Sequence, residues 1–410
     1  MKSLSAKWYL SAISLAIVLA GYSQYLWQYN FQDLPLLKAQ PPGVSLLLIG
    51  FASAFVFWLF APWKVNADKW LKLAVGLLVL TWAIVLITSL VHEDLFTHGV
   101  WTYTPILLML TLKSPTLAET HFAIVFTGWL LVGVLVLTRM LEIMGVLDIA
   151  FIGQGMIAYE PQHYWLPFSG WLGPEFRWPG PMGHNAMTGV IGAYLIVIGV
   201  AIRAKTGVSF AIVGVITMLL TSSRVSFVAA AIGVAIVLFL GNNRLSCRVS
   251  WRARSTLVLV VAAIAAGVAL IFSPNLTGRT SYWPAFVDLW RGSPWIGVGE
   301  TGKTLGGSSV SGTNAHNIFL DTGALYGVLP LLTMTAALAI LVFICVRAAR
   351  AGQVLSFSIV TVFLVIGLTQ ADHGWTEPSQ PWWLLVLAAF MASAANNRTG
   401  LICEGVVESP

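Results

Sequence analysis

Apolar runs long enough to cross a lipid bilayer recur along almost the whole chain. A hydrocarbon layer of about 30 Å requires roughly twenty apolar residues in a helix. The sequence offers about twelve candidates on this criterion, near residues 9–27, 43–62, 70–91, 99–112, 120–147, 185–203, 207–222, 225–241, 255–273, 317–346, 354–371 and 380–396. With 58% hydrophobic and only 9% charged residues, the chain carries more apolar surface than a soluble core could bury. The sequence predicts an all-α polytopic membrane protein that forms one integral membrane domain over residues 1–410.

The basic residues predict how this domain is oriented. With the N-terminus in the cytoplasm, the inner ends and loops carry Lys2, Lys7, Lys64, Lys69, Lys72, Lys113, Arg203, Lys205, Arg244, Arg248, Arg252, Arg254, Arg347, Arg350 and Arg398. The outer side then receives only Lys38, Arg139, Arg177, Arg224, Arg279, Arg291 and Lys303. This asymmetry follows the positive-inside rule, so the net charge of +6 reflects topology rather than nucleic-acid binding. We expect both termini in the cytoplasm and two long outer loops, near residues 148–184 and 274–316.

A phosphate-loop pattern lies in the second outer loop. "GVGETGKT", residues 297–304, satisfies G-x-x-x-x-G-K-[ST]. A functional phosphate loop needs a helix directly after it, whereas "LGGSSVSGTN" follows here. The predicted topology also keeps this loop away from cytosolic ATP. We interpret the pattern as accidental and expect no nucleotide ligand.

Both outer loops are rich in glycine, proline and tryptophan. The first contains "YWLPFSGWLGPEFRWPGPMGHN". Tryptophan and tyrosine favour the membrane interface, so an aromatic belt on the headgroups is the favoured interpretation. A sugar-binding surface remains the alternative, because aromatic faces also stack on pyranose rings. The three cysteines, Cys247, Cys345 and Cys403, fall on the inner side and show no metal-ligand spacing.

Four basic residues near the predicted outer boundary are the first candidates for chemistry. Charges at membrane depth are costly and usually face a cavity or a partner. Arg224 lies between two apolar runs, and His316 lies at the mouth of the tenth run. Arg279 and Arg291 flank a stretch whose apolar residues recur at helical spacing, namely Trp283, Phe286, Val287 and Trp290. We expect this stretch to be an amphipathic helix along the membrane surface.

The chemistry of these residues indicates a diphosphate ligand and a general base. Guanidinium groups bind phosphate oxygens through paired, permanently charged hydrogen bonds. Pairing with lipid phosphates is the plainer alternative for Arg279 and Arg291. His316 could accept a proton from a hydroxyl near neutral pH, or it could simply cap its helix. No D-x-D or His-rich cluster lies on the outer face, so we expect no metal.

Four segments together resemble the O-antigen ligase and O-antigen polymerase superfamily of bacterial envelope glycosyltransferases. They are "GPMGHNAMTGVIGAYL", "SSR" entering a helix, "GRTSYWPAFVDLWRGSPWIGVG" and "HNIFLDTGALYGVLP". Each motif is loose by itself, but their order and spacing are specific, and they cover residues 180–335. The predicted spans extend the resemblance over the chain.

The resemblance implies transfer of a glycan from an undecaprenyl-pyrophosphate carrier to an acceptor hydroxyl, on the outer face of the bacterial inner membrane. No nucleotide, metal or other cofactor is implied. Carried onto this chain, Arg224, Arg279 and Arg291 would bind the pyrophosphate, and His316 would activate the acceptor, with inversion at the anomeric carbon. His184, Asn317 and Arg177 are secondary candidates, and Asp288, Glu300 or Asp321 is an alternative base.

Two further choices stay open at this point. A polymerase would use another lipid-linked repeat as acceptor and a ligase would use lipid A core; the wording of "GRTSYW" and "SPWIGVG" favours a polymerase. A flippase for the same lipid-linked oligosaccharide is the main rival from another class, because twelve spans also suit transporters. Transporters typically show internal repeats and mid-span polar groups, whereas here the charges gather at the outer boundary. We therefore favour glycosyl transfer.

Overall fold

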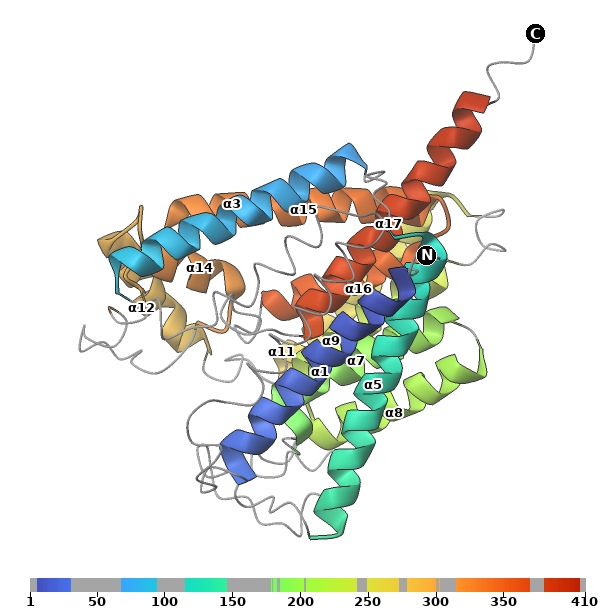
Figure 1. The fold of residues 1–410 in the computed structure, drawn as a ribbon, viewed down its shortest axis with the longest axis horizontal. Coiled ribbons are helices and arrows are strands. Elements are labelled where there is room, and N and C mark those ends of the chain that lie inside the picture. The colour runs from blue at the N-terminus through green and yellow to red at the C-terminus, as the bar shows by residue number, and fades with distance from the viewer. Residues whose placement is uncertain are drawn as a thin grey trace, which may run out of the picture.

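Helices account for all the regular secondary structure that the structure describes. The computed structural model describes residues 6–30, 68–93, 115–145, 178, 180–182, 185–202, 204–241, 249–272, 279–299, 302, 315–368 and 380–405. The helices are α1 (Ala6–Asn30), α3 (Lys69–Val91), α5 (Leu117–Ile143), the short 3-10 helix η5 (Gly180–Met182), α7 (Asn185–Ile202), α8 (Lys205–Thr221), α9 (Arg224–Ala235), which continues into the π-helix η6 (Ile236–Leu240), α11 (Trp251–Phe272), α12 (Arg279–Gly292), α14 (Ile318–Tyr326), α15 (Val328–Arg350), α16 (Val354–Gly367) and α17 (Gln380–Gly405). The predicted all-α class is confirmed for these residues (Figure 1).

Three of the described helices, α3, α5 and α15, are long and apolar enough to cross a membrane, and further apolar helices are shorter. Capping explains where two of the three begin. The Asp68 carboxylate accepts the Trp70 backbone N–H at 3.2 Å before α3, and Thr116 and Glu119 form a reciprocal capping box before α5. The predicted spans near residues 43–62 and 99–112 lie outside the described residues. The number of spans and their orientation in the membrane therefore stay predictions.

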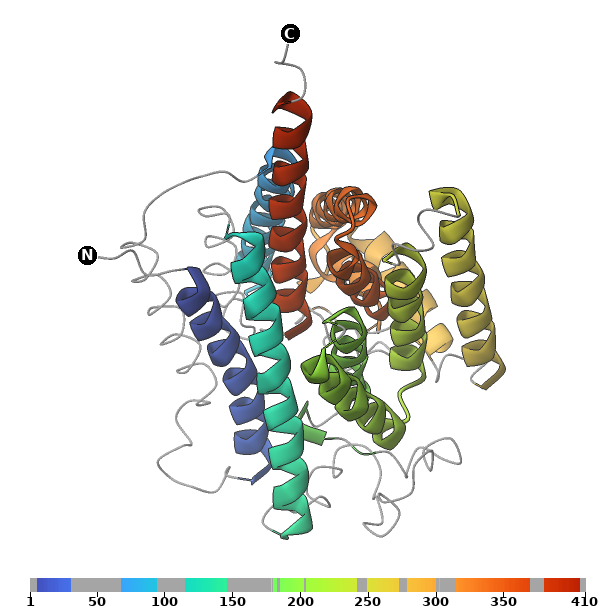
Figure 2. The same cartoon turned by 90° about the vertical axis from the view of Figure 1, so that its right-hand side faces the viewer.

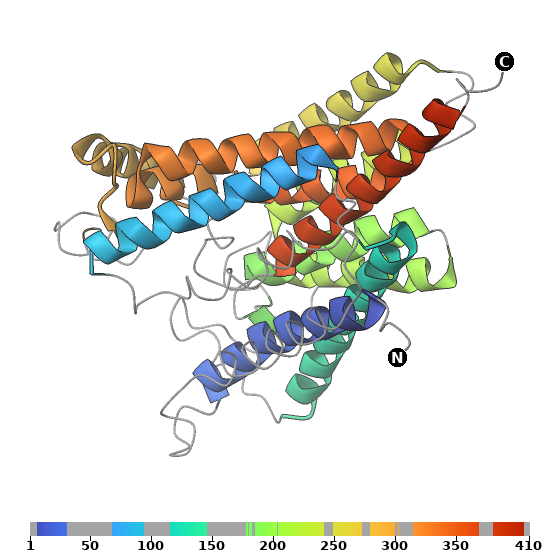
Figure 3. The same cartoon turned by 45° about the horizontal axis from the view of Figure 1, so that its top comes forward.

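Neighbouring helices pack antiparallel at several places. In α3 and α15, the Thr81 hydroxyl donates to the Thr333 hydroxyl at 2.7 Å, and the rings of Trp70 and Phe343 meet edge to face. The two helices therefore run side by side in opposite directions, as Figure 3 shows. In Figure 2 the N-terminal ends of α1 and α5 and the C-terminal end of α17 lie toward the same side of the bundle.

Glycines bring α7 and α8 into unusually close contact. A methyl group on Gly192 would lie 2.9 Å from the carbonyl oxygen of Gly214. Gly199 and Gly207 oppose each other in the same way, further along the pair, and a methyl group on either would meet the carbonyl oxygen of the other. Small residues that let backbones approach are the usual means by which apolar helices associate in membranes.

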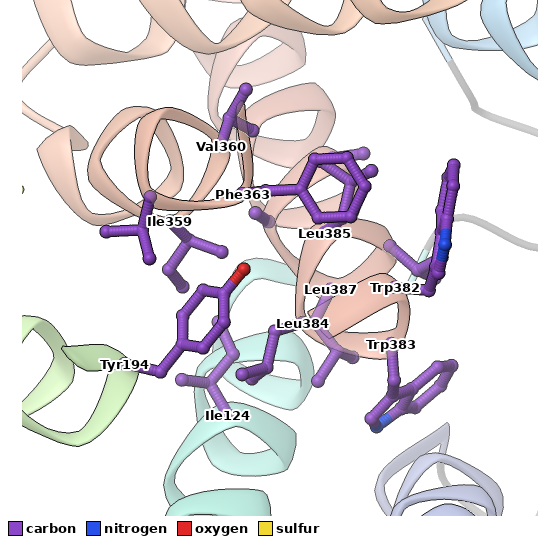
Figure 4. Close-up of a cluster of buried hydrophobic side chains, with 14 of the residues drawn as sticks. Ile124, Tyr194, Ile359, Val360, Phe363, Trp382, Trp383, Leu384, Leu385 and Leu387 are labelled. Carbon is purple, nitrogen blue, oxygen red and sulfur yellow. The ribbon is translucent and has the colours of Figure 1, made fainter. Parts of the chain in front are cut away.

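Buried side chains from many helices, among them α5, α7, α16 and α17, fill the centre of the bundle. Figure 4 shows Ile124 of α5, Tyr194 of α7, Phe363 of α16 and Trp382 of α17 in one cluster. The rings of Phe363 and Trp382 meet edge to face with centroids 4.8 Å apart. This core holds α7 and α16 in place, and both helices lead to the candidate site.

The tenth apolar run is not one helix. The apolar run over residues 317–346 predicts a continuous helix, but α14 ends at Tyr326 and α15 begins at Val328. Gly327, between them, has φ of +92°, which glycine adopts without strain. The expectation of a continuous helix is therefore wrong at this point.

A segment of the predicted second outer loop explains the break. Residues 293–298, "SPWIGV", pack against the ends of both helices. The Val298 N–H donates to the Ala324 carbonyl of α14, and the Val328 N–H of α15 donates to the Pro294 carbonyl, both at 2.9 Å. The segment thus takes up backbone groups that an unbroken helix would pair internally.

Candidate functional site

Arg224 follows a tight serine turn between α8 and α9. Ser222 ends α8 in the left-handed region, with φ of +49°, and Ser223 is the N-cap of α9. Ser222, Ser223 and Ser226 are buried, and the hydroxyls of Ser223 and Ser226 lie 2.8 Å apart. Arg224 is the first residue of α9 and is half-buried. Its side chain therefore extends from a helix N-terminus, where the partial charge is positive and favours the binding of an anion.

Helix α7 packs directly on this serine turn. A methyl group on Gly189 would lie 2.5 Å from the Cβ atom of Ser223 and 3.0 Å from the Ser226 hydroxyl. No larger side chain fits without moving the turn. Close packing from α7 thus limits the positions available to Arg224.

His316 lies in a second tight turn, directly before α14. Its φ is +51°, again in the left-handed region. The preceding residue is tied on both sides: the Ala315 N–H donates to Asp321 Oδ1 at 2.9 Å, and the Ala315 carbonyl accepts the indole N–H of Trp283 at 2.8 Å. These bonds hold the histidine in a defined place although its backbone is irregular.

Asn317 secures the other side of the histidine turn. Its side-chain oxygen caps α14 by accepting the N–H groups of Phe319 and Leu320 at 3.0 and 3.1 Å. Its amide group donates to the carbonyl of Leu368, the residue that follows α16, at 3.1 Å. Asn317 thereby links the histidine turn to the C-terminal end of α16.

The serine turn and the histidine turn lie at one end of the bundle. Helices α9 and α16 run antiparallel, because Gly233 adjoins Val362 while Gly241 adjoins Val354. The N-terminus of α9 is therefore on the side where α16 ends, and Asn317 binds that end. We call this end of the bundle, where α8 and α16 end and α9 and α14 begin, the site end.

Helix α12 confirms the amphipathic helix predicted between Arg279 and Arg291. Phe286 is fully buried, and Trp283 and Trp290 join it in a small cluster with Ala315 and with Ala324 of α14. The apolar side of α12 thus packs on α14, beside the histidine turn. Its placement along a membrane surface stays a prediction.

Of the two arginines of α12, the structure describes the side chain of Arg291 but not that of Arg279. The side chain of Arg291 is 76% exposed and donates to Asp288, also exposed, at 3.2 Å. Arg279 begins the helix, but its side chain lies outside the described residues. Among the predicted residues, Arg224, His316 and Asn317 thus come to the site end, and Arg291 lies on the surface of the helix packed beside it.

The remaining candidates are placed as follows. Arg177, His184 and Glu300 lie outside the described residues. Asp321 supports the histidine turn through Ala315, and Asp288 pairs with Arg291, so both carboxylates have structural partners. Within the described part of the chain, no three His, Cys, Asp or Glu side chains gather into a group suited to a metal ion.

The first glycine of the phosphate-loop pattern has a packing role. Gly297 has φ of +66°, and a methyl group on it would meet the backbone carbonyl of Leu325. It lies in the segment 293–298 that packs on the break after α14. This contact explains why position 297 is a glycine without any role in binding phosphate.

Sequence reasoning missed a buried acid at the site end. Glu142 of α5 accepts the indole N–H of Trp178 at 2.9 Å on both carboxylate oxygens and pairs with Arg139 at 2.9 Å. An acid near the end of an apolar run is a signal that the sequence contains. Its partner Trp178 is 36 residues away in the sequence, however, and no periodicity connects the two.

Residues 208–335 match the O-antigen ligase family. The match supports the predicted resemblance to the O-antigen ligase and polymerase superfamily. It runs from within α8 into α15 and includes Arg224, α12 and the histidine turn. No curated protein shows a significant match to the chain. The match and the apolar helices together indicate a membrane protein in which residues 208–335 are similar to the O-antigen ligase family.

Proposed function

We propose that this protein is a membrane glycosyltransferase of the O-antigen ligase and polymerase type, with an undecaprenyl-pyrophosphate-linked glycan as donor. The observation that carries the proposal is the juxtaposition of the serine turn and the histidine turn at the site end. Both belong to the segment that matches the O-antigen ligase family. In this proposal the site end faces the outside of the bacterial inner membrane.

The donor pyrophosphate would bind beside Arg224. The helices α9 and α14 both begin at the site end, and helix N-termini favour phosphate groups. Arg291 and Arg279, from the two ends of α12, would add further guanidinium groups. The pair of Arg291 with Asp288 is exposed and therefore weak, so a pyrophosphate would compete for this arginine.

His316 would act as general base on the acceptor. Its imidazole takes the proton of the acceptor hydroxyl, and the hydroxyl oxygen attacks the anomeric carbon. The bond from that carbon to the pyrophosphate breaks, and the electron pair leaves with the undecaprenyl pyrophosphate. Attack from the face opposite the leaving group inverts the anomeric carbon. Arginine stabilises the charge that develops on the pyrophosphate.

We favour a polymerase, in which the acceptor is another lipid-linked repeat. The residues of "GRTSYW" and "SPWIGVG", which are more similar to those of polymerases, support this choice. A ligase that uses lipid A core is the alternative, and a flippase is the rival from another class. All three would bind the same donor, so the acceptor and the fate of the carrier decide between them.

Reconstitution in liposomes tests the proposal. Wild-type protein is given undecaprenyl-pyrophosphate oligosaccharide without nucleotide, and glycan length and free carrier are measured. We expect longer lipid-linked glycan and free carrier from wild type, and a loss of about 100-fold or more in His316→Asn. Asparagine tolerates the left-handed turn but cannot serve as the base. We expect Arg224→Ala to lose roughly tenfold to a hundredfold, because a charged hydrogen-bond partner is removed.

Two matched variants control for nonspecific damage. His121→Asn changes an exposed histidine near the start of α5, and Arg252→Ala changes an exposed arginine near the start of α11. Both lie away from the site end and should retain wild-type activity. Product that forms only with lipid A core would identify a ligase. A carrier that keeps its glycan with either acceptor would contradict the proposal and favour a flippase.

A further inference from the structure

A buried carboxylate is linked to the serine turn through Trp178. The side chain of Glu142 is fully buried near the C-terminal end of α5. Both carboxylate oxygens accept the indole N–H of Trp178, and one also accepts Arg139 Nη1, all at 2.9 Å. A charge buried in this way persists only where its partners are held in good geometry.

Trp178 connects Glu142 to the C-terminal end of α8. It is itself 2% exposed, and its backbone N–H donates to the carbonyl of Leu220 at 3.0 Å. Leu220 lies in the last turn of α8, where carbonyls have no partner within the helix. Trp178 therefore fixes the end of α8 directly before the serine turn and Arg224. The guanidinium of Arg139 lies 5.7 Å from the centre of the indole ring and keeps the ring oriented.

Gly180, two residues after Trp178, contacts α7. Gly180 has φ of +60°, and a methyl group on it would meet the side chain of Thr188 on α7. The next residue of α7, Gly189, abuts Ser223. Trp178 and η5 thus lie between α5 and α7, and α7 contacts the serine turn.

We propose that Glu142 is a positioning residue for Arg224, acting through Trp178 and the end of α8. The inference deepens the proposed function and rests on it, because it assigns Arg224 to the donor pyrophosphate. An apolar pair could close the same gap between helices without the cost of burying a carboxylate. A tryptophan held by both oxygens of one carboxylate instead defines the position of the serine turn. Glu142 lies outside the matched segment 208–335 and does not touch the donor in this account.

A double-substitution cycle tests this inference by binding alone. The dissociation constant for undecaprenyl pyrophosphate in detergent micelles is measured for wild type, Glu142→Gln, Arg224→Lys and the double variant. We expect Glu142→Gln to weaken binding by about tenfold in the wild-type background and by less than about twofold beside Arg224→Lys. An equal factor in both backgrounds would overturn the inference, because the residue would then act on the fold in general.

Two further variants keep the result interpretable. Trp178→Phe keeps a ring beside Arg139 but removes the indole N–H, so it should weaken binding with the same dependence on Arg224; a wild-type constant would overturn the inference. Glu119→Gln makes the same chemical change at the opposite end of α5 and should leave binding unchanged. Melting temperatures identify variants that lose the fold.

The same measurements separate this inference from the proposed function. Carrier binding with the expected coupling, but without glycan transfer by wild type, would contradict glycosyl transfer and support the role of Glu142. Absence of carrier binding by wild type would overturn both.

Discussion

The α7–α8 pair and the α12–α14 pair both require close approach, but they achieve it by different means. In α7–α8, glycines on both helices let backbone meet backbone, as at Gly192 and Gly214. In α12–α14, side chains bind the backbone instead: Trp283 holds the carbonyl of Ala315, and Asp321 holds its N–H. The first pair joins two regular helices, whereas the second holds an irregular turn that contains a histidine.

This difference separates stability from activity. Contacts between regular helices contribute to the fold, and those far from the serine turn can be lost without moving a reacting group. Hydrogen bonds to an irregular turn fix the position of one side chain, which is the condition for a preorganised site. We therefore expect changes in the part of α7–α8 remote from the serine turn, around Gly199 and Gly207, to alter stability, and changes in α12–α14 to alter kinetics.

The largest effect is expected from Gly199→Ala in α7. The added methyl group would meet the carbonyl oxygen of Gly207 and lie 2.7 Å from the N–H nitrogen of Ala211, and neither backbone atom can give way cheaply. We expect a loss of about 1–3 kcal/mol in unfolding free energy. Thermal and denaturant unfolding of the purified protein measures it, with activity per folded molecule unchanged.

Gly133→Ala is the matched control for this prediction. A methyl group on Gly133 of α5 has no atom within 4 Å, so the same substitution should be neutral or stabilising by less than about 1 kcal/mol. Equal destabilisation by both substitutions would show that the contact between α7 and α8 is not the cause of the effect of Gly199→Ala.

Trp283→Phe should have a smaller effect, on kinetics. The ring can still pack on α14, but the Ala315 carbonyl loses its indole donor at 2.8 Å. We expect kcat to fall about fivefold, which corresponds to about 1 kcal/mol for one hydrogen bond, with little change in melting temperature. Trp8→Phe, at a tryptophan that is 66% exposed, is the control. A fall in melting temperature with unchanged kcat would reverse the comparison between the two pairs.

Asp288→Asn should have the smallest effect. It removes an exposed ion pair on α12 and a negative charge close to Arg291. We expect the KM for the donor to fall by up to about threefold at low salt, with unchanged stability, because exposed pairs contribute little. Asp68→Asn, which retains an N-cap on α3, is the control. A raised KM for the donor would mean that Asp288 supports the site rather than competing for Arg291.

The regular elements of this fold follow directly from local sequence. Apolar runs near residues 70–91, 120–147 and 185–203 became α3, α5 and α7, and the spacing of Trp283, Phe286 and Trp290 predicted α12. These predictions succeed because helix formation depends on periodicity and composition over short windows.

The features that sequence reasoning missed depend on contacts between distant segments. The break at Gly327 arises because residues 293–298 bind the backbone on both sides of it, and apolar periodicity continues across that point. Glu142 and Trp178 likewise meet only in three dimensions. Among the predicted site residues, Arg224 and His316 are conspicuous in the sequence because Arg224 separates two apolar runs and His316 directly precedes another. Their shared position depends on the antiparallel register of α9 and α16, which no local pattern carries.

In the proposed function, Arg224 binds the donor and His316 acts on the acceptor at the same site. The most direct test measures both steps in one preparation: the dissociation constant for undecaprenyl-pyrophosphate oligosaccharide and the single-turnover rate of carrier release. We predict that His316→Asn binds the donor as wild type does. Its rate of carrier release should be lower by a factor of about 100 or more. We predict that Arg224→Ala binds the donor roughly tenfold or more weakly. Wild-type release rates in His316→Asn, or wild-type donor binding in Arg224→Ala, would contradict the account.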